Sequence, residues 1–198
     1  MNSKFIIGIL ILVLGSVKLQ AQKLNFLIPD GATIQHAGSI GYLSAGVNYE
    51  LFKNKRGSLD VLYGYLPESE GGSFSTLTSK FAYRPIRINL NKQISVYPVN
   101  PGAFFSYTIE KDFDLTWDRD QYPKKYYFWS EALHLHVSFS NELHFDTSRL
   151  LSSKKLKALV LYHEVNSNEM YLINYFQNPK ALSLTDIFKG GVGIKALF

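Results

Sequence analysis

Hydrophobic and polar side chains alternate almost without a break along residues 132–146. The odd-numbered positions are apolar with one exception: Leu133, Leu135, Val137, Phe139, Asn141, Leu143 and Phe145. The even-numbered positions are polar: His134, His136, Ser138, Ser140, Glu142, His144 and Asp146. Because successive side chains of a strand point to opposite faces, this pattern predicts one long strand with an apolar face and a polar face.

The length of this strand favours a membrane location. Strands of globular proteins usually have ~3–10 residues, whereas a strand that crosses a bilayer at a tilt needs ~9–11 and can extend beyond the lipid. We therefore predict that it belongs to an outer-membrane β-barrel. Its odd-numbered face would contact lipid, and its even-numbered face would point into the barrel.

A weaker alternation predicts further strands, which gives eight in all: 39–51, 58–66, 74–89, 93–110, 126–146, 155–165, 169–176 and 190–198. Bacterial single-chain membrane barrels have an even number of strands, and short connections favour antiparallel neighbours. The predicted fold class is therefore all-β: an antiparallel, closed transmembrane β-barrel of eight strands with a polar, filled lumen.

One connection conflicts with this count. If the chain starts in the periplasm, the segment 111–125 falls on the periplasmic side, where turns are usually short. Either one strand is miscounted, or this protein has an unusually long periplasmic loop.

The N-terminal residues 1–21 predict a secretory signal peptide. Lys4 supplies the positive start, the apolar core runs over 5–17, and Ala21 is a plausible cleavage position. The apolar core is too short to span a membrane as a helix, although an uncleaved anchor is the alternative. The sequence therefore predicts a signal peptide at 1–21 and a single barrel domain at 22–198. Within that domain, Gln22–Ala37 is predicted to form a short periplasmic lead-in.

Composition narrows the possible partners. The chain has no cysteine, which excludes disulfides and a lipid anchor on a mature N-terminal cysteine. The net charge of +5 falls to +3 once Lys4 and Lys18 leave with the signal peptide, and the basic residues are scattered, so nucleic acid is not an expected partner. Aromatic residues make up 15% of the chain, and a membrane barrel uses such residues in two interfacial girdles.

One aromatic cluster combines tyrosine and tryptophan with lysines that can reach lipid headgroups. It consists of Tyr122, Lys124, Lys125, Tyr126, Tyr127 and Trp129. We interpret it as part of an interfacial belt; the alternative is a sugar or lipid site.

The last strand alternates as well and ends on an aromatic residue. Val192, Ile194, Ala196 and Phe198 share one face. This resembles the closing strand that the outer-membrane assembly machinery recognises, so that machinery is an expected partner through Phe198; an ordinary edge strand is the alternative. Together with the stretches 38–49, 59–67 and 121–129, the chain resembles a group of small, functionally uncharacterised Gram-negative outer-membrane barrels. The resemblance implies a fold and a location, and it brings no catalytic residues.

Several residues on the polar face of 132–146 could carry chemistry. His134 and His136 could share a metal, and His136 with Ser138 and Glu142 could form a hydrolase site. Outer-membrane barrel enzymes that deacylate lipid A use a His-x-Ser pair with a glutamate, and His136-Val137-Ser138 is similar to that pair. Here Phe139 replaces the family's asparagine, the glutamate is not at the family's distance, and the pair lies on the face assigned to the lumen. We favour a structural role for these side chains as hydrogen-bonded filling of a small barrel.

Charged residues elsewhere could form ion pairs inside the lumen or lie at its rims: Arg84, Arg87, Glu50, Asp60, Glu110 and Glu164. The predicted function is therefore that of an outer-membrane barrel without cofactors, with a structural or surface-interaction role, in contact with the bilayer and lipopolysaccharide. One alternative is a lipid-A-modifying hydrolase on the same barrel. A second is a secreted soluble barrel, which would place apolar side chains inside and polar ones outside.

Overall fold

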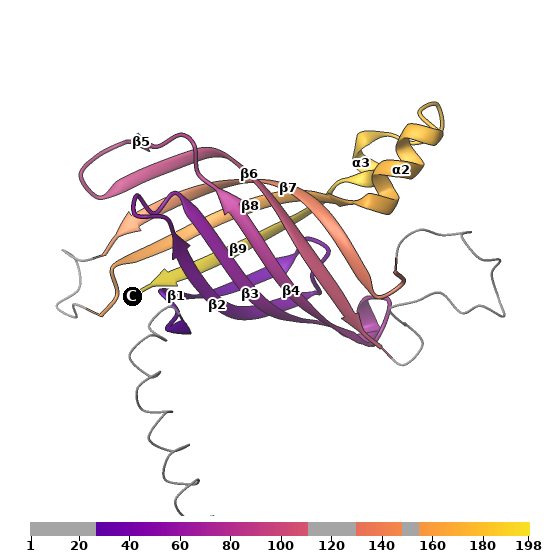
Figure 1. Ribbon diagram of the computed structural model, residues 1–198, viewed down its shortest axis with the longest axis horizontal. Coiled ribbons are helices and arrows are strands. Elements are labelled where there is room, and N and C mark those ends of the chain that lie inside the picture. The colour runs from indigo at the N-terminus through magenta and orange to yellow at the C-terminus, as the bar shows by residue number, and fades with distance from the viewer. Residues whose placement is uncertain (1–26, 111–129, 148–154) are drawn as a thin grey trace, which may run out of the picture.

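Eight strands close into one antiparallel barrel in the computed structural model, which describes residues 27–110, 130–147 and 155–198 (Figure 1). The barrel strands are β1 (Gly31–Ala37), β2 (Leu43–Leu51), β3 (Gly57–Leu66), β4 (Phe74–Tyr83), β6 (Ile94–Ile109), β7 (Leu133–Asp146), β8 (Ala158–Asn168) and β9 (Lys189–Leu197). Each pairs with the next barrel strand along the chain, and β1 pairs with β9. The closed, antiparallel, eight-stranded arrangement predicted from the sequence is thus confirmed.

The two ends of the barrel differ. At the end that we call the terminal end, β1 begins, β9 finishes, and the two-residue strand β5 (Ile88–Asn89) pairs with the start of β6. The opposite end, which we call the helical end, carries the 3-10 turn η2 (Glu68–Glu70) and the helices α2 (Glu169–Gln177) and α3 (Leu184–Ile187) (Figure 1). In the described parts of the chain, no helix combines the length and apolar character needed to cross a bilayer.

The register fixes the shape of the barrel. A path that follows directly paired residues from Leu143 in β7 passes through β8, β9, β1, β2, β3, β4 and β6. It returns to β7 at Leu133, ten residues from its start. With about 4.8 Å between strands and about 3.3 Å per residue, this stagger tilts the strands roughly 40° from the barrel axis.

The orientation of the two strand faces agrees with the prediction from residues 132–146. On β7 the outward-facing Val137 and Phe139 are 39% and 49% exposed, whereas the inward-facing His136 and Glu142 are each 3% exposed. The same holds on β9, where Ile194 is 49% exposed and Lys195 is 4% exposed. Polar residues therefore fill the interior, and apolar residues cover the outer wall.

Two strand assignments differ from the sequence prediction. Residues 169–176, predicted as a strand, form α2, because the side chain of Asn168 accepts a hydrogen bond from the backbone N–H of Tyr171 and caps a helix there. Gly31–Ala37, predicted to lie in the lead-in, forms β1. Its inner face carries only Thr33 and Gln35 between small and apolar residues, so its pattern is less pronounced than that of β7.

These two changes remove the conflict over the long connection. With β1 added at the start, residues 111–129 join β6 to β7 at the helical end, which also carries α2 and α3. Those residues themselves, like the predicted signal peptide at 1–21 and the aromatic belt at 121–129, lie outside the described ranges. The strand predicted at 74–89 ends at Tyr83 as β4, and Pro85 lies between it and β5. Within the strand predicted at 93–110, the pairing of β6 with β7 has a register shift between Tyr97 and Asn100.

A short apolar plug closes part of the helical end from within. Ile40, in the connection between β1 and β2, is fully buried and clusters with Leu62 and Phe104. The hydroxyls of Ser44 and Thr76 donate to the Ile40 carbonyl at 2.8 and 2.6 Å. This connection therefore folds into the barrel and does not project from it.

Gly64 makes room for this inward-folded connection. A Cβ atom at position 64 would lie 1.8 Å from the Ile40 carbonyl oxygen, a backbone atom that cannot move independently. We predict that Gly64→Ala lowers the free energy of unfolding by about 1–3 kcal/mol, the usual cost of overpacking an interior. Chemical unfolding in detergent micelles measures it. Gly190→Ala is the matched control, since its Cβ would meet only the His163 ring at 3.8 Å; equal stability of the two variants would contradict the prediction.

Candidate functional site

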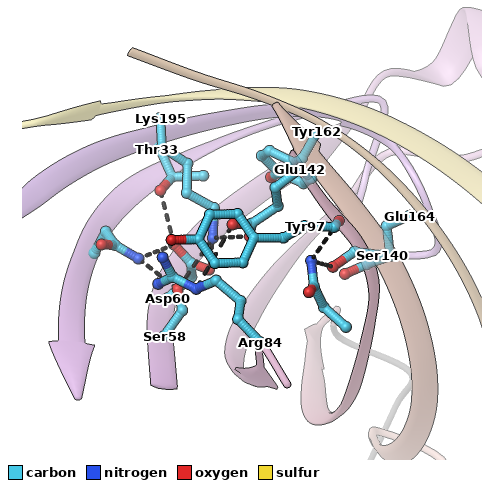
Figure 2. Close-up of polar contacts among 12 residues, drawn as sticks. Thr33, Ser58, Asp60, Arg84, Tyr97, Ser140, Glu142, Tyr162, Glu164 and Lys195 are labelled. Atoms are coloured by element: carbon cyan, nitrogen blue, oxygen red, sulfur yellow. Dashed lines mark hydrogen bonds and ion pairs between the residues drawn. The ribbon is translucent and has the colours of Figure 1, made fainter. Parts of the chain in front are cut away.

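Buried charged groups from five strands (β3, β4, β7, β8 and β9), together with Arg84 directly after β4, meet in the middle of the barrel. Among the described residues, Lys80, Arg84 and Lys195 and the carboxylates of Asp60, Glu142 and Glu164 are each at most 4% exposed. Three cations and three anions thus lie in an interior that is almost inaccessible to solvent. Figure 2 shows most of these side chains converging from opposite walls. We call these six residues the central network.

Asp60 on β3 is the most completely bonded member of the central network. Its Oδ2 lies 2.8 Å from the Nζ of Lys195, and its Oδ1 accepts hydrogen bonds from Thr33 and Asn48, each at 2.8 Å (Figure 2). The Nζ of Lys195 also donates to the Ser58 hydroxyl at 3.1 Å. The carboxylate is therefore stabilised in its charged form by one cation and two neutral donors.

Glu142 on β7 joins the two halves of the central network. Its Oε1 lies 3.5 Å from Lys195, and its Oε2 lies 3.6 Å from the Nε of Arg84. The same Oε2 accepts a hydrogen bond from the Nε2 of His144 at 2.7 Å. Arg84 extends the chain of charges to Glu50 at 3.7 Å and lies over the ring of Tyr97.

A second ion pair lies beside this group. The Nζ of Lys80 is 3.1 Å from Glu164 and donates to the side-chain oxygen of Gln35, which also accepts from the Tyr162 hydroxyl. The Tyr162 ring lies between the two lysines, with ring-centroid distances of 5.2 Å to Lys80 and 5.0 Å to Lys195. Its electron-rich face thus stabilises both cations.

The central network separates two cavities. One, of about 460 Å³, opens at the terminal end and is lined by Glu50, Lys55, Arg87 and His144, among others. There the Lys55 ammonium donates to Glu50 at 2.7 Å, and this hydrogen bond raises the pKa of Lys55. The other, of about 670 Å³, lies at the helical end.

The cavity at the helical end contains a serine and a histidine in contact. Ser106 and His136 both line it, and the Ser106 Oγ lies 2.9 Å from the His136 Nε2. The other ring nitrogen, Nδ1, lies 3.3 Å from the side-chain oxygen of Asn166. The His136 ring is stacked on Phe104, with 4.2 Å between ring centroids and 9° between their planes. We call Ser106, His136 and Asn166 the serine–histidine–asparagine group.

The residues proposed from the sequence are distributed over this interior. His136 contacts Ser106 and Asn166, while Glu142 belongs to the central network and bonds His144. His134 donates through Nδ1 to Glu169 of α2 at 2.7 Å, and the His134 and His136 ring centroids are 6.5 Å apart. Ser138 is buried on the same face. No set of three or more potential metal-ligating side chains occurs within the described ranges.

The predicted lumen ion pairs form in part. Arg84 with Glu50, and the carboxylates of Asp60 and Glu164, take part as predicted, whereas Arg87 donates to the Ser95 hydroxyl. Lys80 and Lys195, the cations that pair with those carboxylates, were not identified from the sequence. Nor were Ser106 and Asn166. All four lie at inward positions of an alternating strand, which is the only signal the sequence offers for them.

Comparison with known proteins did not identify a family or a relative for this chain. No protein-family model matches the chain, and no curated protein matches it.

The Lys80–Glu164 pair provides a test of the central network. We predict that Glu164→Gln alone lowers the free energy of unfolding by about 3–5 kcal/mol, because it leaves the Lys80 charge buried without its counter-charge. The double variant Lys80→Met, Glu164→Leu removes both charges and should recover most of that loss. Denaturant titration in micelles measures both; a double variant less stable than the single one would contradict the prediction.

Proposed function

We propose that this protein is an integral outer-membrane β-barrel with a closed interior, and that its role is structural or lies in surface interactions at the lipid and lipopolysaccharide layer. The observation that carries the proposal is the polarity of the wall: a soluble barrel would bury its apolar residues and expose its polar ones. Here the order is reversed, since the interior holds the central network and the exterior is apolar.

An uncharged, largely apolar band encircles the barrel, although exposed polar residues such as His36, Asn141 and His163 also lie on the outer wall. The path of paired residues used above to trace the register runs through outward side chains without a charge: Leu143, Leu161, Ile194, Ile34, Ala45, Tyr63, Leu77, Tyr107 and Leu133. An apolar band of this extent is unfavourable in contact with water. A surrounding layer of lipid tails would cover this whole band with apolar contacts.

The height of the wall suits a bilayer. At the tilt given by the register each residue rises roughly 2.5 Å along the axis. The ten residues each of β3 and β4 therefore span roughly 25 Å, the height of the apolar band of transmembrane barrels. Closure also leaves no unpaired edge among the eight barrel strands, and lipid could not satisfy such an edge.

Aromatic residues are found toward both rims. Near the terminal end the ring of Phe52 makes edge contacts with Phe81 and Tyr83, each at 6.4 Å between centroids. Toward the helical end the hydroxyl of Tyr63 donates to the Ser75 hydroxyl at 2.7 Å, while its ring is 54% exposed. Rings with one apolar and one polar side are favoured at a membrane–water boundary.

The interior supports a barrel that does not conduct. Eight strands enclose a space that side chains can fill, and the central network occupies its middle from wall to wall (Figure 2). An ion crossing the barrel would have to break several of these contacts. We therefore expect no stable conductance from the protein in planar bilayers, and we expect it to fractionate with the outer membrane.

Arginine substitutions at two equally exposed positions test the membrane location. Ile194, next to the middle of β9, and Ile109, at the helical end of β6, are both 49% exposed on the outer wall. In a membrane Ile194→Arg should cost about 2–4 kcal/mol of folding free energy in lipid vesicles, whereas Ile109→Arg should cost about 0–1 kcal/mol. In a water-soluble barrel both changes would stay within about 0.5 kcal/mol. Equal, small effects together with recovery of the protein in the soluble periplasm would refute the proposal.

A further inference from the structure

We propose that the cavity at the helical end is an ester-hydrolysing site, with Ser106 as nucleophile, His136 as its general base and Asn166 as the residue that positions the base. The proposal goes beyond a structural barrel and does not depend on the membrane location. It rests on three side chains from three neighbouring strands, β6, β7 and β8. Ser106 and His136 line the cavity, and Asn166 contacts the His136 ring.

The hydrogen bonds fix the histidine in the form that a general base needs. The side-chain nitrogen of Asn166 donates to the Gly38 carbonyl at 2.8 Å, so its oxygen is the atom that faces His136. An amide oxygen only accepts, and therefore His136 carries its proton on Nδ1. Nε2 then has a free lone pair, which accepts the hydrogen bond of the Ser106 hydroxyl.

The packing holds this arrangement rigid. Phe104, directly opposite His136 in the β6–β7 register, stacks on one face of its ring. His134 approaches with its ring almost perpendicular, at 84°, and is itself held by Glu169. The base is thus positioned by packing as well as by hydrogen bonds, as nucleophilic catalysis requires.

The chemistry follows from these roles. The Ser106 Oγ attacks the carbonyl carbon of an ester while its proton passes to the Nε2 of His136, and the resulting tetrahedral intermediate collapses as the proton moves on to the departing alkoxide. This leaves an acyl group on Ser106 and releases an alcohol. Water then attacks the acyl group, giving its proton to His136, which returns it to Ser106 as the carboxylic acid leaves.

A hydroxyl group lies next to the nucleophile without a partner. Thr78 is directly opposite Ser106 in the β4–β6 register and is 1% exposed. Its hydroxyl makes no hydrogen bond within the described residues. Directly opposed side chains in a sheet have Cβ atoms about 4.5–5.5 Å apart, so this hydroxyl is placed to donate to the oxyanion that forms beside Ser106.

The cavity suggests the size and character of the substrate. Its volume of about 670 Å³ is in the range of small-molecule sites, and its lining combines the apolar Leu66 and Phe74 with Tyr171 of α2 and a single lysine, Lys189, near the helical end. The lining nearest Ser106 is polar, whereas Leu66 and Phe74 lie four positions farther along β3 and β4 toward the helical end. A small acyl group therefore suits the space at Ser106, and the apolar part of the alcohol would lie nearer the helical end. We therefore assign carboxylic esters with a short acyl chain as the substrate class.

A fluorophosphonate probe tests the nucleophile directly, because it forms a covalent bond with activated serines. The full-length protein, folded in detergent micelles, is treated with the probe, and the labelled residue is identified by mass spectrometry. The expected result is a label on Ser106 that is lost in Ser106→Ala and formed at least about 100-fold more slowly in His136→Asn. Ser140 is also a buried inward-facing serine, but it lies on β7. Ser140→Ala is therefore the matched control, and this variant should label at the wild-type rate.

Turnover of p-nitrophenyl butyrate tests the remaining roles. Thr78→Val keeps the shape of the side chain and removes the hydroxyl, so kcat should fall by about 10²–10³ with KM little changed. Asn166→Ala should lower kcat because the histidine loses its fixed tautomer. Circular dichroism must show that each variant is folded. A folded wild-type protein that takes no label, a label on a serine other than Ser106, or a labelling rate that does not depend on His136 would each overturn the proposal.

Discussion

The contact between Lys195 and Asp60 is the interaction on which the interior depends. Both groups are almost fully buried, and either charge alone in that position would be strongly unfavourable. They lie 135 positions apart in the sequence and on strands that are not neighbours, so the contact can form only once the barrel has closed. Glu142 and, through it, Arg84 extend from this pair, and the Lys80–Glu164 pair lies beside it at the Tyr162 ring. The polar interior is therefore tolerated because its charges balance in number and meet at close range.

The small circumference explains why the interior is divided in this way. Eight strands leave space for side chains and little else, so long residues such as Lys80 and Arg84 meet partners on strands that are not their neighbours. Toward the two ends space remains between the side chains of the walls. The two cavities are a consequence: the central network fills the middle, and the narrow interior opens on either side of it.

The alternation of side chains could be predicted from the sequence because it depends only on neighbouring residues. It gave the correct orientation for β7 and β9, including the burial of His136 and the exposure of Phe139. The α2 segment could not be assigned by this criterion, since its apolar residues suit a helix as well as a strand; the cap at Asn168 decides between them. The contact of Ser106 with His136 could not be predicted either, because it requires the register between β6 and β7. Register is set by the whole closed sheet and is not visible in one strand.

The position of the serine–histidine–asparagine group depends on the same barrel geometry that assembles the central network. The network fills the middle of the barrel, below the cavity at the helical end. Ser106, His136 and Asn166 come from β6, β7 and β8, whose relative heights are fixed by the same register that brings Lys195 to Asp60. A one-residue slip of β7 would turn His136 to the outer wall and Glu142 out of the network at the same time. The geometry around Ser106 is therefore as firmly determined as the ion pairs at the centre.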